Sequence, residues 1–325
     1  MKDSLAGRDI LSEKQKIISV VGPTASGKTR LAVELAKIFD GEVISADSMQ
    51  IYQGMQIATA KPDDNEMQGI PHHLIDFVPP GETYSVAMFT QDAKRCIEDI
   101  ASRNKLPILA GGTGLYIDSL LQNIKFSDEE RDEELSQRLR QRYELEGLEP
   151  LLQTLSEIDP QSYERLKEGR NPKRVIRAIE FYYTTGKTIT EQNEQSRLEE
   201  TPYDAIKLGL GFIDREKLYD RINLRVDLML QNGLLEEARQ VLSSDLSRTS
   251  VMAIGYKELA PYFDGEQSLE ECIEKLKRET RRYAKRQLTW FKRDKELNWL
   301  YVDEESCFDD LLDKAVQIIK GRLYG

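Results

Sequence analysis

A phosphate-binding loop is the strongest chemical signal in the sequence. Residues 22–29 read GPTASGKT and match the pattern G-x-x-x-x-G-K-T, directly after the apolar run IISVV of residues 17–21. In such a loop the backbone N–H groups surround an anionic phosphate, the lysine adds a cation and the threonine hydroxyl can bind Mg²⁺. The motif does not say which group is transferred. The cradle is expected to consist of Gly22, Pro23, Thr24, Ala25, Ser26, Gly27, Lys28 and Thr29.

Two further groups of polar residues follow expected strands. Asp47 and Ser48 come after the apolar run of residues 43–46, and the segment GGTGLY of residues 111–116 supplies the Thr113 hydroxyl. A carboxylate at the edge of a sheet can accept a proton from a nucleophile or bind a metal through water. Two alternatives remain open: Asp47 caps the turn that follows it, and residues 111–116 form a plain strand-to-helix turn.

Other residues that commonly carry chemistry do not form a site. The adjacent pair His72 and His73 cannot build a multi-histidine metal site, and we interpret it as a buried structural pair because no nucleophile lies nearby in the sequence. The cysteines Cys96, Cys272 and Cys307 are far apart and lack metal-ligand spacing. We expect reduced thiols.

Cations gather in two places on a chain whose net charge is −11. Residues 275–295 hold ten Lys or Arg against two acids and include Trp290 and Phe291. Cations beside aromatic rings suit phosphate contacts with base stacking, although such rings more often lie in a core. The segment NPKRVIRAIE of residues 171–180 adds Lys173, Arg174 and Arg177, of which Arg174 and Arg177 share one face of an expected helix, although such a segment alone is usually a solvated face. The sequence therefore predicts a localised basic face on an acidic protein.

The order of the expected elements predicts an α/β protein. Apolar strands and amphipathic helices alternate through the first third of the chain, so that Gly22, Asp47 and Gly111 follow strands at one edge of a parallel sheet. Charged helical segments then follow, each stopped by Gly or Pro, before AIKLGLGF and NWLYVD return to strand patterns and Ser268 with Glu271 begins a long helix. We expect a P-loop NTPase-like parallel sheet core, residues 1–119 and 203–325, with an inserted all-helical domain, residues 120–202.

The composition is that of a soluble protein. The chain has 39% apolar residues and no run of 18 of them, and its first residues lack the apolar centre of a secretory signal. We expect a cytoplasmic protein with no membrane contact.

Eight motifs in order resemble the bacterial tRNA dimethylallyltransferases. They are GPTASGKT, ADSMQIYQGMQIATAKP, PHHLID, GGTGLY, NPKRVIRAIE, RINLRVDLML, AIGYKE and RRYAKRQLTWFK, and they extend over about residues 17–300. The resemblance implies transfer of a dimethylallyl group from dimethylallyl diphosphate to the exocyclic amine of the adenine 3′ of the anticodon. The partners would be the anticodon stem-loop of tRNA and Mg²⁺, and we expect a monomer.

The resemblance also assigns roles to individual residues. It makes Asp47 the base, Thr29 the Mg²⁺ ligand beside the leaving diphosphate and Arg221 a cation that supports this diphosphate, while the helical insertion grips the anticodon stem. The residues that it places on the RNA side are Asp47, Ser48, Met49, Gln50, Thr113, Lys173, Arg174, Val175, Ile176, Arg177, Val251, Met252, Ala253, Ile254, Gly255, Tyr256, Lys285, Arg286, Gln287, Leu288, Thr289, Trp290, Phe291 and Lys292.

Three other functions share parts of this pattern. An adenylate isopentenyltransferase would use the same loop and aspartate on AMP, ADP or ATP, but it would not need the helical insertion or the basic helix. A P-loop kinase would use the loop on ATP, and an RNA-binding adaptor would need only the basic face.

Overall fold

The computed structural model describes residues 14–126, 132–197, 200–243 and 253–324. The chain forms two compact units, of which the first joins Met1–Leu121 to Pro202–Gly325 and the second is Gln122–Thr201. The insertion expected from the sequence had the bounds 120–202, against Gln122–Thr201 for the second unit.

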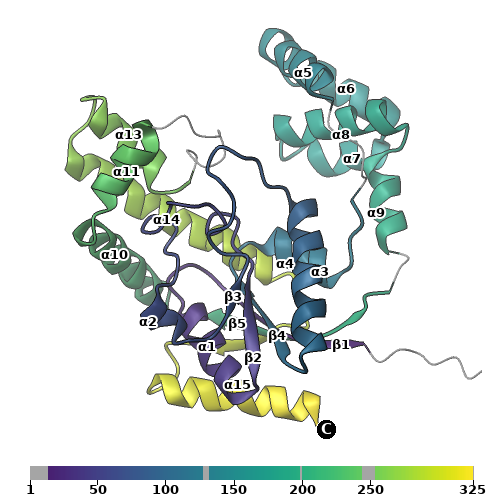
Figure 1. The fold of residues 1–325 in the computed structure, drawn as a ribbon. Coiled ribbons are helices and arrows are strands. Elements are labelled where there is room, and N and C mark those ends of the chain that lie inside the picture. Colours follow the sequence, from purple (N-terminus) through teal and green to yellow (C-terminus); the bar gives the residue numbers. More distant parts are fainter. Residues whose placement is uncertain (1–13, 127–131, 198–199, 244–252, 325) are drawn as a thin grey trace, which may run out of the picture. The chain divides into compact units, whose positions relative to one another are not determined.

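The first unit is built on a six-stranded sheet in which every strand pair is parallel (Figure 1). The strand order is β3-β2-β4-β1-β5-β6. The strands are β1 (Gln15–Val21), β2 (Gly41–Ser45), β3 (His72–His73), β4 (Leu106–Gly111), β5 (Tyr203–Gly211) and β6 (Asn298–Tyr301). The expectation of a parallel α/β core is confirmed. In the register, Val21 pairs with Gly111 and Ser45 with Ala110, so that β1, β2 and β4 end at the same edge.

Helices cover both faces of this sheet. Alternate side chains of β1 point to opposite faces: Ile17 packs with α3 (Val86–Ser102) and α4 (Gly114–Leu121), and Ile18 with α1 (Lys28–Ile38) and α15 (Phe308–Leu323). Both faces are apolar, as expected for the strands of a sheet buried on both sides. The short α2 (Asp64–Met67) begins with a capping box made by Asp63 and Glu66.

A third cluster of apolar side chains lies beyond the sheet. It joins residues 49–58 to α10 (Arg215–Gln231), α11 (Leu234–Ser243), α13 (Tyr256–Phe263) and α14 (Leu269–Phe291). Helix α14 begins with the expected capping box, in which the Ser268 hydroxyl accepts from the Glu271 N–H at 3.2 Å and the Glu271 carboxylate from the Ser268 N–H at 2.9 Å. The last turn of α14 adds Phe291 to the cluster beside α3 and α4. This long helix therefore connects the extra helices to the sheet.

The second unit contains only helices in its described residues. They are α5 (Glu133–Glu146), α6 (Glu149–Ile158), α7 (Pro160–Leu166), α8 (Pro172–Thr185) and α9 (Ile189–Arg197). The side chains of Asp132, Asp159 and Asn171 cap α5, α7 and α8, and proline at the first turn of α7 and α8 suits a helix start. Leucine and isoleucine residues of α5, α6 and α8 form a separate core. In the described part of the chain no helix is both long and apolar enough to cross a membrane.

Candidate active site

The phosphate loop turns sharply between β1 and α1. Gly22 and Gly27 have φ of 151° and 92°, values that side-chain-bearing residues rarely adopt, and a Cβ on Gly22 would lie 2.7 Å from the carbonyl oxygen of Leu210. The Ser26 hydroxyl donates to the Pro23 carbonyl at 2.8 Å, and the Lys28 ammonium donates to the same oxygen at 2.7 Å. The cradle is thus held in shape by its own side chains.

Lys28 and Arg225 bring two cations to this loop. Burial and, second, the nearby Arg225 charge lower the pKa of Lys28 against the opposing effect of Asp47, and together these effects bring it to about 7. Burial also lowers the pKa of Arg225, whose Nη1 lies 3.4 Å from the Thr24 hydroxyl. Among the described residues no carboxylate forms an ion pair with either side chain. The site therefore holds positive charge that an anion can neutralise.

Arg221, the cation that the resemblance pointed to, lies at the same loop. Its Nε donates to the Ala25 carbonyl at 2.9 Å, and its guanidinium group lies over the Phe212 ring at 5.8 Å. Arg225 follows Arg221 by one helical turn of α10, so that both reach the loop from one face of the helix. Arg225 was not predicted from the sequence, although its i, i+4 spacing from Arg221 was the signal for it.

Asp47 and Thr113 meet at the edge where β2 and β4 end. The Ser48 N–H donates to the Thr113 hydroxyl at 3.0 Å, and the Thr113 N–H donates to the Ala46 carbonyl at 3.1 Å. Oδ1 of Asp47 accepts from the Met49 N–H at 2.9 Å, which is the turn-capping contact left open above. Because β1, β2 and β4 end at the same edge, Asp47 caps this turn at the edge where the phosphate loop also begins.

Helix α14 reaches the same edge from outside the sheet. The Gln287 side chain accepts a hydrogen bond from the Thr24 N–H at 2.9 Å and donates one to the Gly112 carbonyl at 3.0 Å. Tyr283 shares hydrogen bonds with Thr113 and Gln287, and burial, with the Asp47 charge second, raises the pKa of its hydroxyl. Two polar side chains of α14 therefore contact the loop and the turn directly.

The structure divides the residues expected on the RNA side into exposed and buried groups. The exposed ones on α8, on α14 and at the C-cap of α14 are Lys173, Arg174, Arg177, Lys285, Arg286, Thr289 and Lys292. The side chains of Val175, Ile176, Ala253, Tyr256, Gln287 and Phe291 are buried, and Leu288 packs against the small cluster around Leu218 and Ile222. A helix turns about every third or fourth side chain inward. The assignment of these segments to the RNA side stays a prediction, and only the exposed side chains could meet RNA directly. Val251 and Met252 lie outside the described residues.

Several half-buried residues of this set also have internal partners. The Trp290 indole donates to Oδ2 of Asp118 at 2.7 Å, and Gln50 accepts from the Ser45 hydroxyl at 3.1 Å and donates to the Ala60 carbonyl at 3.0 Å. Met49 and Ile254 pack on the cluster beyond the sheet, where a Cβ on the buried Gly255 would lie 2.9 Å from that of Ala58. The side chains of these residues are thus held by contacts within the protein.

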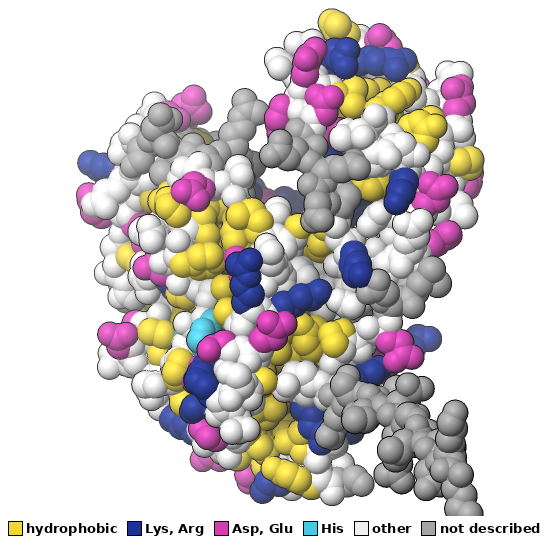
Figure 2. Space-filling model, turned by 45° about the vertical axis from the view of Figure 1, so that its right-hand side comes forward, with side chains coloured by type: hydrophobic (Ala, Val, Ile, Leu, Met, Phe, Trp, Pro, Cys, Tyr) yellow, Lys and Arg dark blue, Asp and Glu magenta, His cyan; other side chains and the backbone are white. Residues whose placement is uncertain are grey.

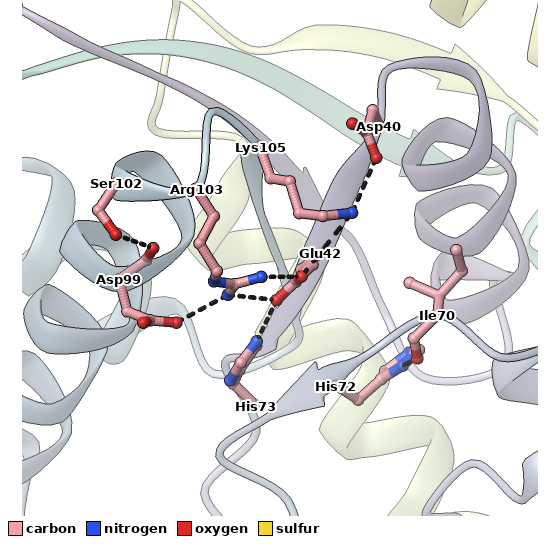
Figure 3. A network of polar contacts seen from close by, with 9 residues as sticks. All are labelled: Asp40, Glu42, Ile70, His72, His73, Asp99, Ser102, Arg103 and Lys105. Carbon is pink, nitrogen blue, oxygen red and sulfur yellow. Dashed lines mark hydrogen bonds and ion pairs between the residues drawn. The ribbon is translucent and has the colours of Figure 1, made fainter.

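His73, but not His72, belongs to a separate polar network around Glu42, near the start of β2 (Figure 3). Arg103 donates to both carboxylate oxygens of Glu42, with the Nη2–Oε2 bond at 2.8 Å, and His73 Nε2 lies 2.8 Å from Oε2. The Arg103 bonds lower the pKa of Glu42 to about 2. His72 contacts the Ile70 carbonyl at 2.8 Å, and burial lowers its pKa. The network lies at the opposite end of β2 from Asp47. Both histidines are half-buried and have one hydrogen-bond contact each, whereas Nε2 of His72 is buried without a partner among the described residues. Figure 2 shows a histidine at the surface with cationic and acidic side chains interspersed around it.

Known proteins match both the sequence and the fold. The family profile described as IPP transferase matches residues 50–294, and one described as isopentenyl transferase matches residues 15–78. The tRNA dimethylallyltransferase of Acetivibrio thermocellus is 49% identical over 310 residues, which cover 95% of this chain and 96% of that protein.

Two solved structures share the fold. The tRNA isopentenylpyrophosphate transferase from Bacillus halodurans matches with a TM-score of 0.72 and 43% identity, over 95% of this chain and 97% of that one. A eukaryotic dimethylallyltransferase acting on tRNA matches with a TM-score of 0.77 and 32% identity, over 93% of this chain and 77% of that one. The resemblance found in the sequence is confirmed: the chain belongs to the IPP transferase family, to which these tRNA dimethylallyltransferases also belong.

Proposed function

We propose that the protein transfers a dimethylallyl group from dimethylallyl diphosphate to the exocyclic amine of the adenine 3′ of the anticodon in tRNA, acting as a monomer. The observation that carries this proposal is the pair Lys28 and Arg225, two cations without a carboxylate partner in the described residues, at the edge where Asp47 also lies. Family membership supports the choice of prenyl group and tRNA.

The reaction moves one proton and one leaving group. The adenine nitrogen forms a bond to the allylic carbon, the bond from this carbon to the diphosphate oxygen breaks, and the amine proton passes to Asp47. Lys28, Arg225 and Arg221 lie around residues 24–28, where they stabilise the charge that grows on the diphosphate. Asp47 keeps one oxygen on the Met49 N–H, which leaves the other for the proton.

The residues present fit a Mg²⁺ ion that arrives with the diphosphate. Thr29 lies in the first turn of α1 directly after Lys28, and the described residues contain no cluster of three His, Cys, Asp or Glu that would hold a metal alone. Mg²⁺ prefers oxygen ligands and keeps several waters. Thr29 would supply one ligand, and the metal would add positive charge at the leaving group.

The exposed cations support the RNA part of the proposal. Arg282, Lys285 and Arg286 are exposed on α14, and Lys173, Arg174 and Arg177 are exposed on α8 of the helical unit. Salt-dependent phosphate contacts of such side chains supply most of the affinity of RNA-binding surfaces. We propose that the helical unit binds the anticodon stem. The target base must leave its stack to reach the edge of the sheet.

One experiment separates this function from its alternatives. The purified protein is given dimethylallyl diphosphate with either unmodified tRNA or AMP, and in parallel ATP with the same tRNA, and the products are digested and weighed. We expect an adenosine heavier by one prenyl unit only with dimethylallyl diphosphate and tRNA. Prenylated AMP would favour the adenylate enzyme, and phosphorylated RNA without prenylation would favour the kinase.

A further inference from the structure

Gln287 is a buried polar side chain on a helix that is otherwise rich in exposed cations. Its side chain is 5% exposed, whereas its neighbours Lys285 and Arg286 are exposed. Both hydrogen bonds given above go to backbone atoms, at Thr24 and at Gly112, which lie 263 and 175 residues away in the sequence. A buried amide with both ends bonded fixes the distance between the two segments that it joins.

The turn after β4 is shaped to receive this side chain. A Cβ on Gly112 would lie 2.1 Å from Nε2 of Gln287, and one on Gly114 would lie 2.3 Å from the Trp290 ring. Gly112 does not have a positive φ, so the reason for glycine here is the close approach of Gln287. Gly112 and Gly114 therefore allow α14 to pack closely against this turn.

The two segments joined by Gln287 hold the two halves of the proposed reaction. Thr24 belongs to the phosphate loop, and its N–H is directed to Gln287 instead of the cradle. Gly112 precedes Thr113, whose hydroxyl accepts from the Ser48 N–H beside Asp47. A shift of either segment would change the distance between the diphosphate and the base, and misplacement by about 1 Å can cost about 10²-fold in rate.

We propose that Gln287 is a positioning residue that holds the phosphate loop in register with the turn at Thr113, and so aligns the diphosphate with Asp47. The inference rests on the proposed function for its effect on the rate. It makes α14 an element with two roles, since its outer face carries the cations for RNA and its inner face fixes the anion cradle.

The test uses the full chain and two variants that break the same contact from opposite sides. Gln287→Met keeps the volume and removes both hydrogen bonds, whereas Gly112→Ala keeps Gln287 and displaces its flexible end. For both we expect kcat to fall by about 10- to 100-fold, with the KM for tRNA unchanged. Affinity for inorganic diphosphate with Mg²⁺, measured by calorimetry, should fall by about tenfold. Hydrogen exchange of the Thr24 amide should accelerate by at least about tenfold, while β1 and β4 stay protected.

Gln317→Met, at an exposed position of α15, is the matched control and should change none of these quantities. Unchanged kcat, diphosphate affinity and Thr24 exchange in both variants would overturn the positioning role. A higher KM for tRNA at unchanged kcat would overturn it too, because Gln287 would then act in RNA binding. If the unmodified protein transfers no prenyl group, the proposed function is wrong. Diphosphate affinity and Thr24 amide exchange in the two variants still show whether Gln287 positions the phosphate loop.

Discussion

The two clusters of charge at opposite ends of β2 differ in whether their charges are paired. At the start of the strand, buried Glu42 is bonded to Arg103 and His73. Beyond its other end, Lys28 and Arg225 lie near the phosphate loop with no carboxylate at ion-pair distance in the described residues.

The pKa shifts show what this difference means. In the first cluster the partner favours the charged form and lowers the pKa of Glu42 to about 2, which stabilises the fold. In the second, burial disfavours the charged form and lowers the pKa of Lys28 to about 7. A cation withdrawn from water without a carboxylate partner is costly unless a ligand supplies the counter-charge. In this protein the paired charges thus lie away from the proposed binding site, and the cations without a carboxylate partner lie at it.

The largest expected effect comes from removing the ligand-facing charge of the second cluster. Lys28→Ala with Thr29→Ala deletes one cation and the proposed metal ligand, so we expect turnover to fall by more than about 10⁴-fold. Lys37→Ala, in the last turn of the same helix, is the control because Lys37 is paired with Glu34 at 2.9 Å. Prenylation of tRNA at a rate close to that of the parent would show that the loop does not hold the leaving group.

Asp47→Asn should have the next largest effect. The amide oxygen still accepts from the Met49 N–H, so the turn is kept, but the side chain can no longer take a proton. We expect turnover to fall by about 10²–10⁴-fold, the usual contribution of a positioned general base, with unchanged tRNA affinity. Single-turnover prenylation measures this directly. A loss of only a fewfold would leave Asp47 as a turn cap and not the base.

Local patterns in the sequence predicted the parts of the site that depend on neighbouring residues. The phosphate loop, the turn at residues 111–116 and the capping box at Ser268 each depend on a few consecutive residues, and each lies where it was expected. The second strand, β2, was predicted for the same reason, whereas β3 was missed because two residues are too short to show an alternating pattern.

Contacts between distant segments could not be predicted in this way. Glu42 meets Arg103 across 61 residues and His73 across 31, and Gln287 meets Thr24 across 263. None of these pairs has a periodic or local signature, since tertiary packing alone brings them together. For the same reason the sequence did not show which side chains of the basic stretch are buried, such as Gln287 and Phe291.

Charge removal should destabilise the protein in the first cluster but not in the second. Glu42→Gln should lower the free energy of unfolding by about 1–3 kcal/mol, with the lower end favoured because Arg103 is partly exposed to water. Arg225→Met removes a cation that has no ion-pair partner among the described residues, so stability should stay or rise, while diphosphate affinity falls by about 10- to 150-fold. Urea unfolding and calorimetry measure both. Comparable destabilisation by the two changes would contradict the distinction between them.

Acid should weaken the first cluster selectively. The pKa of Glu42 is about 2 in the fold against 4.5 for the ordinary group, so its stabilisation is fully present above about pH 4.5 and is lost as pH falls toward about 2. Glu42→Gln should therefore reduce the loss of stability between pH 5 and pH 3 in urea unfolding. Glu34→Gln, on α1 beside Lys37, is the control. An acid slope that is the same in Glu42→Gln and the parent would show that Glu42 is not held charged by Arg103.

The smallest expected effect concerns the exposed cations, each of which contributes to binding through one phosphate. Arg282→Ala with Arg286→Ala should weaken tRNA binding and reduce the slope of log affinity against log salt by about 1 per lost contact. The control is Lys320→Ala with Arg322→Ala, which removes the same charge from α15, on the opposite face of the sheet from the end of α14. Filter binding across a salt series measures both slopes. Counterion release depends on phosphate contacts and not on net charge. An equal change of the salt slope in the two double variants would therefore mean that tRNA is attracted by the overall electrostatic field of the protein. A reduced slope in the α14 variant alone would place bound phosphates along the outer face of α14, whose inner face holds Gln287 against the phosphate loop.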